Sequence, residues 1–205
     1  MALIGAVSLV GCAGKVEFTR PNIVTIPDNV KTVNRSRDQV WNAAIPALGK
    51  QFFVINNLDK SSGLVNVSYT GAPENYIDCG HYTSYVKNAQ GERTYSFPGA
   101  SANQTYEIMD PQQGLFKIHR RLEVEGRVNL VFEQLGPLET RVSANTRYVI
   151  TRKVVIQHNN QTSNSTDSIS FNSRGGASFP AAGNGQSTQC LSNGVLEADI
   201  LKLIN

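Results

Sequence analysis

Little in this sequence points to catalysis. It contains only three histidines and no Gly-x-Ser-x-Gly segment of the kind that sets a nucleophilic serine on a strained turn. The glycine-rich piece Arg174-Gly175-Gly176 lacks the strand, helix and lysine context of a phosphate-binding loop. Glu123 and Glu125 alternate along a strand-like segment and indicate a solvated face rather than the acid pair of a glycosidase. We therefore expect no catalytic residues, no cofactor and no enzymatic activity.

Charge and metal ligands are also sparse. The formal net charge of +3 is too small, and the basic residues too evenly scattered, for a nucleic-acid surface. Asp78, Cys79 and His81 include three types of zinc ligand, but His119 and His158 lie in different segments. We expect neither a nucleic-acid partner nor a metal site.

Long apolar runs are missing from the body of the chain. After the first few residues, no stretch approaches the run of about 20 apolar residues that a membrane-spanning helix needs. The chain has 205 residues, of which 40% are hydrophobic and 17% charged, a composition and length that suit one folded domain. We place this domain at residues 35–205.

What the sequence does have is an apolar leader that ends in a cysteine. Residues 1–11 read MALIGAVSLVG and carry no charged side chain, as in a signal peptide that ends in small residues at its cleavage point. The junction Leu9-Val10-Gly11-Cys12 resembles the lipobox of bacterial lipoproteins. That resemblance implies cleavage before Cys12, a diacylglycerol on its thiol and acylation of the new amine. A buried N-terminal strand or a disordered apolar tail is the alternative.

The surroundings of this cysteine bear on location. The leader is short and lacks the Lys or Arg expected near the start of a signal peptide, which favours a start codon upstream of Met1. Ala13 follows the cysteine, where an aspartate suggests retention in the inner membrane. We therefore expect a lipid anchor in the outer membrane, with the domain on the periplasmic face. Residues 12–34, which include Pro21 and Pro27, are expected to form the acylated cysteine and an extended tether.

Two further cysteines, Cys79 and Cys190, lie in turn-rich polar sequence. An exported protein folds in an oxidising compartment, where two such cysteines are expected to pair. The chain-entropy model values a bond across so long a loop at on the order of 4–5 kcal/mol, or less if the native geometry is strained. The alternative is two unrelated buried thiols. We predict a Cys79–Cys190 disulfide.

Residue periodicity predicts an α+β domain. Ser36 and Gln39 form a capping box ahead of apolar residues at helical spacing, although Pro46 interrupts that helix. A hairpin follows over residues 52–69, and a second helix is expected near the C-terminus, within 190–204.

Three segments between these elements alternate apolar and polar residues, at 116–124, 128–132 and 142–150. Turns are expected at Gly126 and at Gly136-Pro137. Such alternation predicts an antiparallel sheet with one covered face, and we expect the two helices to pack on that face in a helix-grip-like arrangement. Arg120 interrupts the apolar face of the first segment and indicates a bulge, an edge or a buried ion pair.

Two insertions, at about 70–112 and 158–189, separate these elements. All the tyrosines except Tyr148 lie between residues 69 and 106. These rings either pack the insertion onto the sheet or form a contact surface for a protein or glycan. In the second case the candidate partner-binding residues are Tyr76, Tyr82, Tyr85, Arg93 and Tyr95.

Four phrases carry a family resemblance: VWNAAIPALGKQFFVIN, SSGLVNVSY, YIDCG and CLSNGVLEADIL. Together they resemble a group of proteobacterial envelope lipoproteins with a helix-grip-like domain. The opening helix and hairpin are also similar to domains of the lipoprotein C subunit of the outer-membrane β-barrel assembly machinery, although the long insertions depart from that subunit. The resemblance covers roughly residues 36–152 and 188–204. It implies a structural or accessory role and no catalytic residues.

Three functions are therefore weighed. The first is a membrane-anchored periplasmic lipoprotein that acts as a non-enzymatic accessory or assembly module for other envelope proteins. The second is a carrier that holds an apolar small molecule in a helix-grip cavity lined by residues such as Trp41, Phe116 and Leu130. The third is a cell-wall hydrolase.

Overall fold

The computed structural model describes residues 13–22, 25–51, 53–181 and 187–205. In chain order its elements are β1 (Ala13–Thr19), β2 (Val30–Val33), α1 (Arg37–Gly49), β3 (Val54–Asp59), β4 (Leu64–Gly71), η1 (Pro73–Asn75), β5 (Ile77–Asp78), β6 (His81–Asn88), β7 (Gly91–Pro98), β8 (Asn103–Asp110), β9 (Gly114–Gly136), β10 (Glu139–His158), β11 (Gln161–Asn172), β12 (Gly176–Phe179), β13 (Thr188–Ser192) and α2 (Val195–Lys202). Neither α-helix in these residues is long and apolar enough to span a bilayer.

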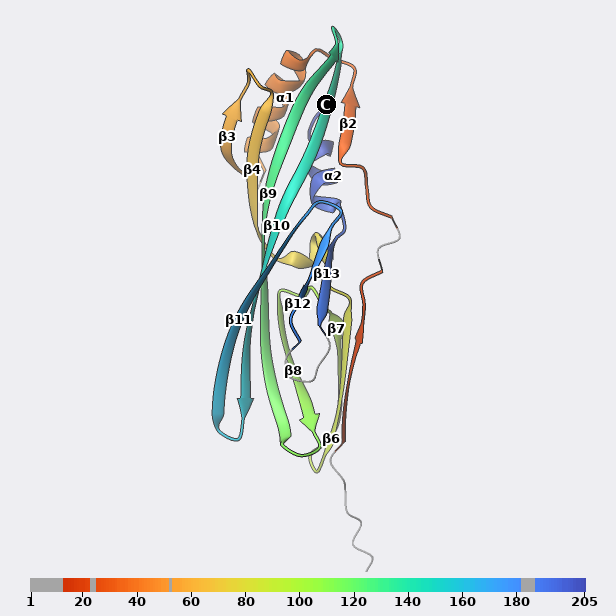
Figure 1. The fold of residues 1–205 in the computed structure, drawn as a ribbon, viewed down its shortest axis with the longest axis vertical. Coiled ribbons are helices and arrows are strands. Elements are labelled where there is room, and N and C mark those ends of the chain that lie inside the picture. The colour runs from red at the N-terminus through yellow and green to blue at the C-terminus, as the bar shows by residue number, and fades with distance from the viewer. Residues whose placement is uncertain (1–12, 23–24, 52, 182–186) are drawn as a thin grey trace, which may run out of the picture.

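Two long antiparallel strands, β9 and β10, run through most of an elongated molecule (Figure 1). In the upper half of the view, β4 pairs with β9 and β2 pairs with β10, while β3 pairs with β4 at the sheet edge. In the lower half, β8 pairs with β9 and β11 pairs with β10. These seven strands form one antiparallel sheet that the two long strands hold together.

The upper half has a packed core. Helix α1 contacts β9 and β10, and α2 contacts β10. Trp41 of α1 packs edge-on against Phe132 of β9, with ring centroids 5.2 Å apart. Glu197 of α2 is buried and accepts hydrogen bonds from the Tyr148 hydroxyl, at 2.7 Å, and the Ser173 hydroxyl, at 2.6 Å. Apolar burial and a fully partnered carboxylate therefore stabilise this half.

The lower half has two layers of sheet. A second sheet, in the order β1-β6-β7, lies over the lower part of the large sheet, and β1 and β6 contact β8. The layers are joined at Glu107 of β8, whose carbonyl accepts from Ser84 Oγ at 2.5 Å and whose carboxylate accepts from Arg93 Nε at 2.6 Å. A third sheet, β12-β13-β5, lies near the middle of the molecule, where β12 contacts β11.

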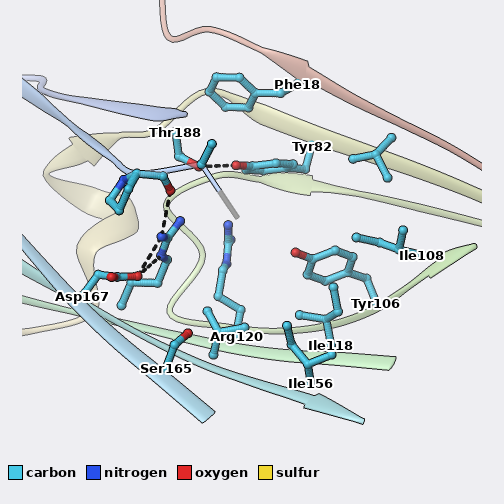
Figure 2. A pocket seen from close by; sticks show the side chains of 15 residues that line it. Phe18, Tyr82, Tyr106, Ile108, Ile118, Arg120, Ile156, Ser165, Asp167 and Thr188 are labelled. Atoms are coloured by element: carbon cyan, nitrogen blue, oxygen red, sulfur yellow. Dashed lines mark hydrogen bonds and ion pairs between the residues drawn. The ribbon is translucent and has the colours of Figure 1, made fainter. Parts of the chain in front are cut away.

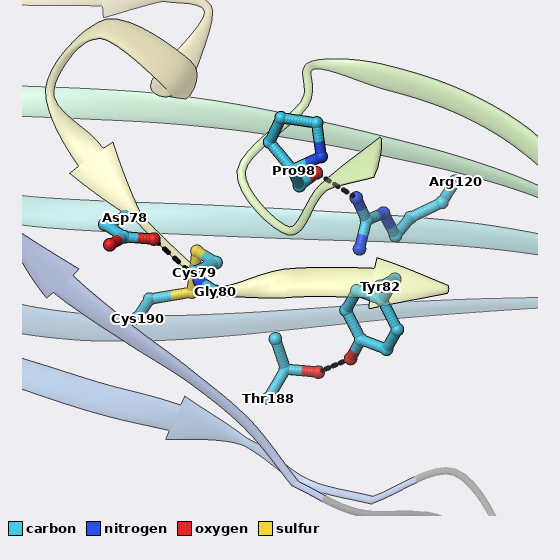
Figure 3. Close-up of a disulfide and its surroundings, with 8 residues drawn as sticks. All are labelled: Asp78, Cys79, Gly80, Tyr82, Pro98, Arg120, Thr188 and Cys190. Atoms are coloured by element: carbon cyan, nitrogen blue, oxygen red, sulfur yellow. Dashed lines mark hydrogen bonds between the residues drawn. A yellow bond between two sulfur atoms is a disulfide. The ribbon is translucent and has the colours of Figure 1, made fainter. Parts of the chain in front are cut away.

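The predicted Cys79–Cys190 disulfide is confirmed, with an S–S distance of 2.01 Å between residues 111 positions apart. Figure 3 shows the bond where β5 leads into β6, beside β13. Gly80 follows with a φ of 71°, and a Cβ there would overlap the Thr19 carbonyl oxygen, so this turn requires glycine. The disulfide therefore ties the third sheet to the start of β6.

The expected α+β, helix-grip-like fold is wrong. Strands make up 62% of the described residues and helices 13%, so the fold is β-rich with large antiparallel sheets. Both segments expected to be insertions, about 70–112 and 158–189, are mostly strand. Strand β11 reads QTSNSTDSISFN and is exposed along most of its length, so no apolar alternation marks it in the sequence. Its backbone pairing with β10 holds it in place.

The turn expected at Gly126 is also wrong, because β9 runs unbroken through this residue. A Cβ at Gly126 would lie 2.9 Å from Leu196 Cδ2, so the missing side chain gives α2 room to approach the middle of the strand. The capping box at the start of α1 is confirmed, and the Ser36 amide donates to Gln39 Oε1 at 3.3 Å.

The residues expected to form a tether contribute two strands. Strand β1 pairs with β6 over its whole length, and β2 pairs with β10. Cys12, the expected acylation site, lies outside the described residues. The described chain therefore begins directly in a strand of the second sheet.

Candidate functional site

A cavity of about 570 Å³ lies in the lower half, between the large sheet and the β1-β6-β7 sheet (Figure 2). Pockets that hold small molecules have volumes of about 300–1,000 Å³. The lining residues are Val16, Phe18, Tyr82, Tyr106, Ile108, Ile118, Arg120, Arg152, Val154, Ile156, Ser165, Asp167, Pro180, Ala181 and Thr188.

The floor of the cavity follows from the two-residue period of its strands. Ile118 and Arg120 of β9 point to the same side, and register pairs Ile118 with both Tyr106 of β8 and Ile156 of β10. Two residue pairs further from the β8–β9 turn, on the same face, Arg120 lies opposite Val154. The floor is therefore apolar toward the hairpin turns and becomes cationic toward the middle of the molecule.

Arg152 lies at the inner end of this floor and is fully engaged. Its Nη2 lies 2.8 Å from Asp167 Oδ2 on the neighbouring strand and donates to the Pro180 carbonyl at 3.2 Å. Its guanidinium carbon lies 4.5 Å from the centroid of the Phe179 ring. This charge is thus neutralised and held in one place by an ion pair, a carbonyl and an aromatic face.

Arg120 is buried without such partners, with only 6% of its surface exposed. Among the residues that the structure describes, its Nε has no hydrogen-bond partner, and Nη2 reaches only the Pro98 carbonyl at 3.5 Å (Figure 3). The guanidinium carbon lies 5.4 Å from the centroid of the Tyr82 ring and 5.2 Å from that of Phe97. Burial lowers the pKa of Arg120, and the nearby Arg152 lowers it further.

The roof of the cavity comes from the second and third sheets. Phe18 of β1 and Tyr82 of β6 are register partners whose ring centroids lie 4.9 Å apart. The Tyr82 hydroxyl is hydrogen-bonded to Thr188 Oγ1 of β13. Because the disulfide joins β13 to the segment just before β6, it also holds this part of the roof together.

The cavity opens between two sheet edges. Val16 of β1 is 44% exposed and Ser165 of β11 is exposed, yet both line the cavity. Strand β1 is one edge of the β1-β6-β7 sheet, and β11 is one edge of the large sheet. A ligand would enter between these edges. Inside the cavity, burial raises the pKa of the Tyr106 hydroxyl, so this group stays neutral at ordinary pH.

The five residues predicted for partner binding do not form one surface. Tyr82 lines the cavity. Register places Arg93 and Tyr95 on the same face of the second sheet as Tyr82, and Arg93 binds Glu107 beneath it. Tyr85 lies on the opposite face of the second sheet. Tyr76 packs against Tyr69 of β4, with ring centroids 5.0 Å apart.

The cavity is also not the one expected between helix and sheet. Trp41 and Leu130 are buried in the upper core, and Phe116 stacks on His158 with centroids 4.1 Å apart. None of these three residues lines the lower cavity. Along α1 there is a separate depression of about 350 Å³, lined in part by Trp41 and Leu58.

Sequence reasoning singled out Arg120 but no other charged residue of the cavity. Arg120 is neither in a bulge nor in an ion pair within the described residues. The overlooked signal lies in β10, where Arg152, Val154 and Ile156 continue the alternation that was traced only to residue 150.

No family model, curated protein or solved structure matches this chain.

Proposed function

We propose that this chain is a non-enzymatic, lipid-anchored envelope protein that binds an apolar small molecule in the cavity between its two lower sheets. The cavity is the single observation that carries the proposal. Its apolar walls come from strands far apart in the sequence, among them Phe18, Ile118 and Ile156. Natural cores are close-packed, and a space of about 570 Å³ between two sheets has the size of a small-molecule pocket.

The direction of β1 supports a membrane location for that occupant. Ala13 pairs with Lys87 close to the β6–β7 turn, whereas Phe18 pairs with Tyr82 near the charged end of the cavity. A lipid on Cys12, directly before β1, would therefore leave the apolar end of the cavity on the membrane side. Acylation of Cys12 and the outer-membrane location rest on the lipobox-like sequence.

A neutral apolar probe tests the binding function. We expect the protein to bind N-phenyl-1-naphthylamine with a rise in probe fluorescence. Val154→Trp places an indole ring on the floor of the cavity, opposite Arg120, and should strongly reduce the rise, whereas Val155→Trp, its neighbour on the opposite face of β10, should not. Absence of binding to the wild-type protein, or equal binding to both variants, would contradict the proposal.

Mass spectrometry of the N-terminus tests the anchor. Protein extracted from membranes should begin at Cys12 and carry the mass of three acyl chains with glycerol. An unmodified cysteine that still follows residues 1–11 would rule the anchor out, without affecting the cavity.

Docking of other envelope proteins is the second candidate function, and the edge strand β3 favours it. Val54 and Leu58 on this strand are 62% and 46% exposed, and β3 has no second strand partner among the described residues. Such an edge suits addition of an extended apolar segment from a partner. A photo-crosslinker at position 54 should capture one specific envelope protein, and a crosslinker at the exposed position 153 should not. Equal labelling from both positions would count against docking.

A further inference from the structure

Arg120 is the group in the cavity that the protein leaves without a counter-charge. Within the described residues its only hydrogen bond is the long one to the Pro98 carbonyl, and its buried Nε has none. The remaining residues, 1–12, 23–24, 52 and 182–186, contain no Asp or Glu. No carboxylate of this chain therefore pairs with Arg120. A guanidinium carries five N–H donors, and burying it without an anion is costly.

Arg152 shows that the same cavity can neutralise a cation. The two arginines lie on neighbouring strands, and Arg152 is paired with Asp167. Across the sheet, Arg120 lies opposite Val154 of β10, which in turn lies opposite Ser165 of β11. Neither side chain carries a charge. The polar end of the cavity therefore has one unmatched positive charge.

The opposite end of the cavity is apolar. Two residues closer to the hairpin turns than Arg120, Ile118 and Ile156 lie opposite each other. Ile108 lies beyond them, toward the β8–β9 turn. Figure 2 shows Arg120 pointing up from the floor toward Tyr82 and Thr188, with the isoleucines to one side of it. A single space thus offers a cation at one end and aliphatic walls at the other.

We propose that the cavity binds an amphipathic anion, with its carboxylate or phosphate oxygens on Arg120 and its aliphatic chain along Ile118, Ile156 and Ile108. The inference rests on the proposed binding function and names its ligand class. A guanidinium fits carboxylate and phosphate oxygens in a two-pronged geometry that a neutral headgroup does not satisfy. The rings of Tyr82 and Phe97 lie beside the guanidinium, which limits its freedom.

The test compares headgroups on one chain length, using delipidated full-length protein and calorimetry. Palmitate and hexadecyl phosphate are the anions, hexadecanol is the neutral analogue, and inorganic phosphate is the headgroup alone. We expect at least one of the two anions to bind about 10- to 100-fold more tightly than hexadecanol, and inorganic phosphate not to bind. Whichever anion binds more tightly shows whether the site prefers a carboxylate or a phosphate headgroup.

Two matched variants test whether Arg120 causes the preference for the anion. Arg120→Met should lose the preference for the anion while still binding hexadecanol. Arg121→Met, the next residue on β9 with its side chain 61% exposed and paired to Glu123, should behave as the wild-type protein. Because Arg120→Met removes a buried charge, its melting temperature should be unchanged or higher; Arg120→Gln is the second variant if Arg120→Met does not fold.

Each other outcome overturns a defined part of the account. Equal affinity for anions and hexadecanol would overturn the headgroup assignment and leave apolar binding intact. Binding of inorganic phosphate as tightly as hexadecyl phosphate would show an anion site without a chain site and overturn the amphipathic ligand. If neither a long-chain compound nor the neutral probe bound, the proposed function would fall as well.

Discussion

Two buried charged residues, Glu197 and Arg120, have opposite surroundings in this protein. Glu197 accepts hydrogen bonds from Tyr148 and Ser173, so its carboxylate is partnered where water is excluded. Within the described parts of the chain, Arg120 has one long hydrogen bond and lies beside two aromatic rings. A buried charge is tolerated when its donors or acceptors are satisfied. We interpret Glu197 as a structural group and Arg120 as a ligand-binding group on this basis.

Replacing Glu197 with alanine tests the structural assignment. Glu197→Ala removes the carboxylate that accepts from the buried Tyr148 hydroxyl and from the half-buried Ser173 hydroxyl, and we expect the free energy of unfolding to fall by about 2–4 kcal/mol. Asp199→Ala on the same helix removes only an exposed pair with Lys202 and should cost less than about 1 kcal/mol. Urea unfolding of both variants measures the difference, and equal losses would contradict the assignment.

Asp59 gives a prediction on pH. Its carboxylate accepts from the Ser61 hydroxyl at 2.7 Å and from the Ser61 and Ser62 amides at 3.0 and 3.2 Å. Hydrogen bonds from the Ser61 and Ser62 side chains, with those from the backbone, lower the pKa of Asp59 from 3.8 to about 2. Because the pKa is lower in the folded state, this contribution to stability is fully present above about pH 4.

Below that pH the contribution disappears as the pH approaches 2. Carbon-13 NMR of the Asp59 carboxyl should therefore titrate near 2, and Asp59→Asn should remove this part of the pH dependence. A midpoint close to 3.8 would show that the β3–β4 turn does not hold the carboxylate in solution.

Among the elements, those with an apolar period were predictable from sequence and those without it were not. The capping box and apolar face of α1 predict this helix correctly, and the alternation around residues 116–150 predicts antiparallel strands. Strand β11 has no such period because both of its faces are largely exposed. Gly126 looks like a turn residue in sequence, but its role is to accommodate Leu196 of a helix that lies 70 residues further along the chain, a contact that no local pattern contains.

The third sheet depends on the disulfide more than on its strands, since β5 has only two residues paired to β13. Replacing Cys79 and Cys190 with serine should lower the free energy of unfolding by about 2–5 kcal/mol. Amide hydrogen exchange should increase most in β5 and β13. A reducing agent should shift the wild-type protein toward the double variant and leave the variant unchanged; protection in β13 that does not respond to reduction would contradict this prediction.

The molecule as a whole divides its length between a packed half and a hollow half. Around α1 and α2, residues such as Leu48, Val128 and Ile200 have no exposed surface, and the depression along α1 is smaller than the lower cavity, at about 350 Å³. Around β6 to β8, two sheets face each other across the cavity. Sequence reasoning expected the cavity beside α1, because an apolar helix over a sheet suggests a helix-grip. The real cavity needs the packing of β6 on β8 and the pairing of β1 with β6, and that pairing joins residues 62 to 74 positions apart in the sequence.

Native mass spectrometry of the protein purified from the cells that naturally produce it tests the central claim most directly. We predict that the wild-type protein and Val155→Trp carry a non-covalent adduct with the mass of an acidic aliphatic lipid, and that Val154→Trp carries none. A wild-type protein that shows only its own mass, with the same spectrum as Val154→Trp, would contradict the claim that this cavity holds a ligand.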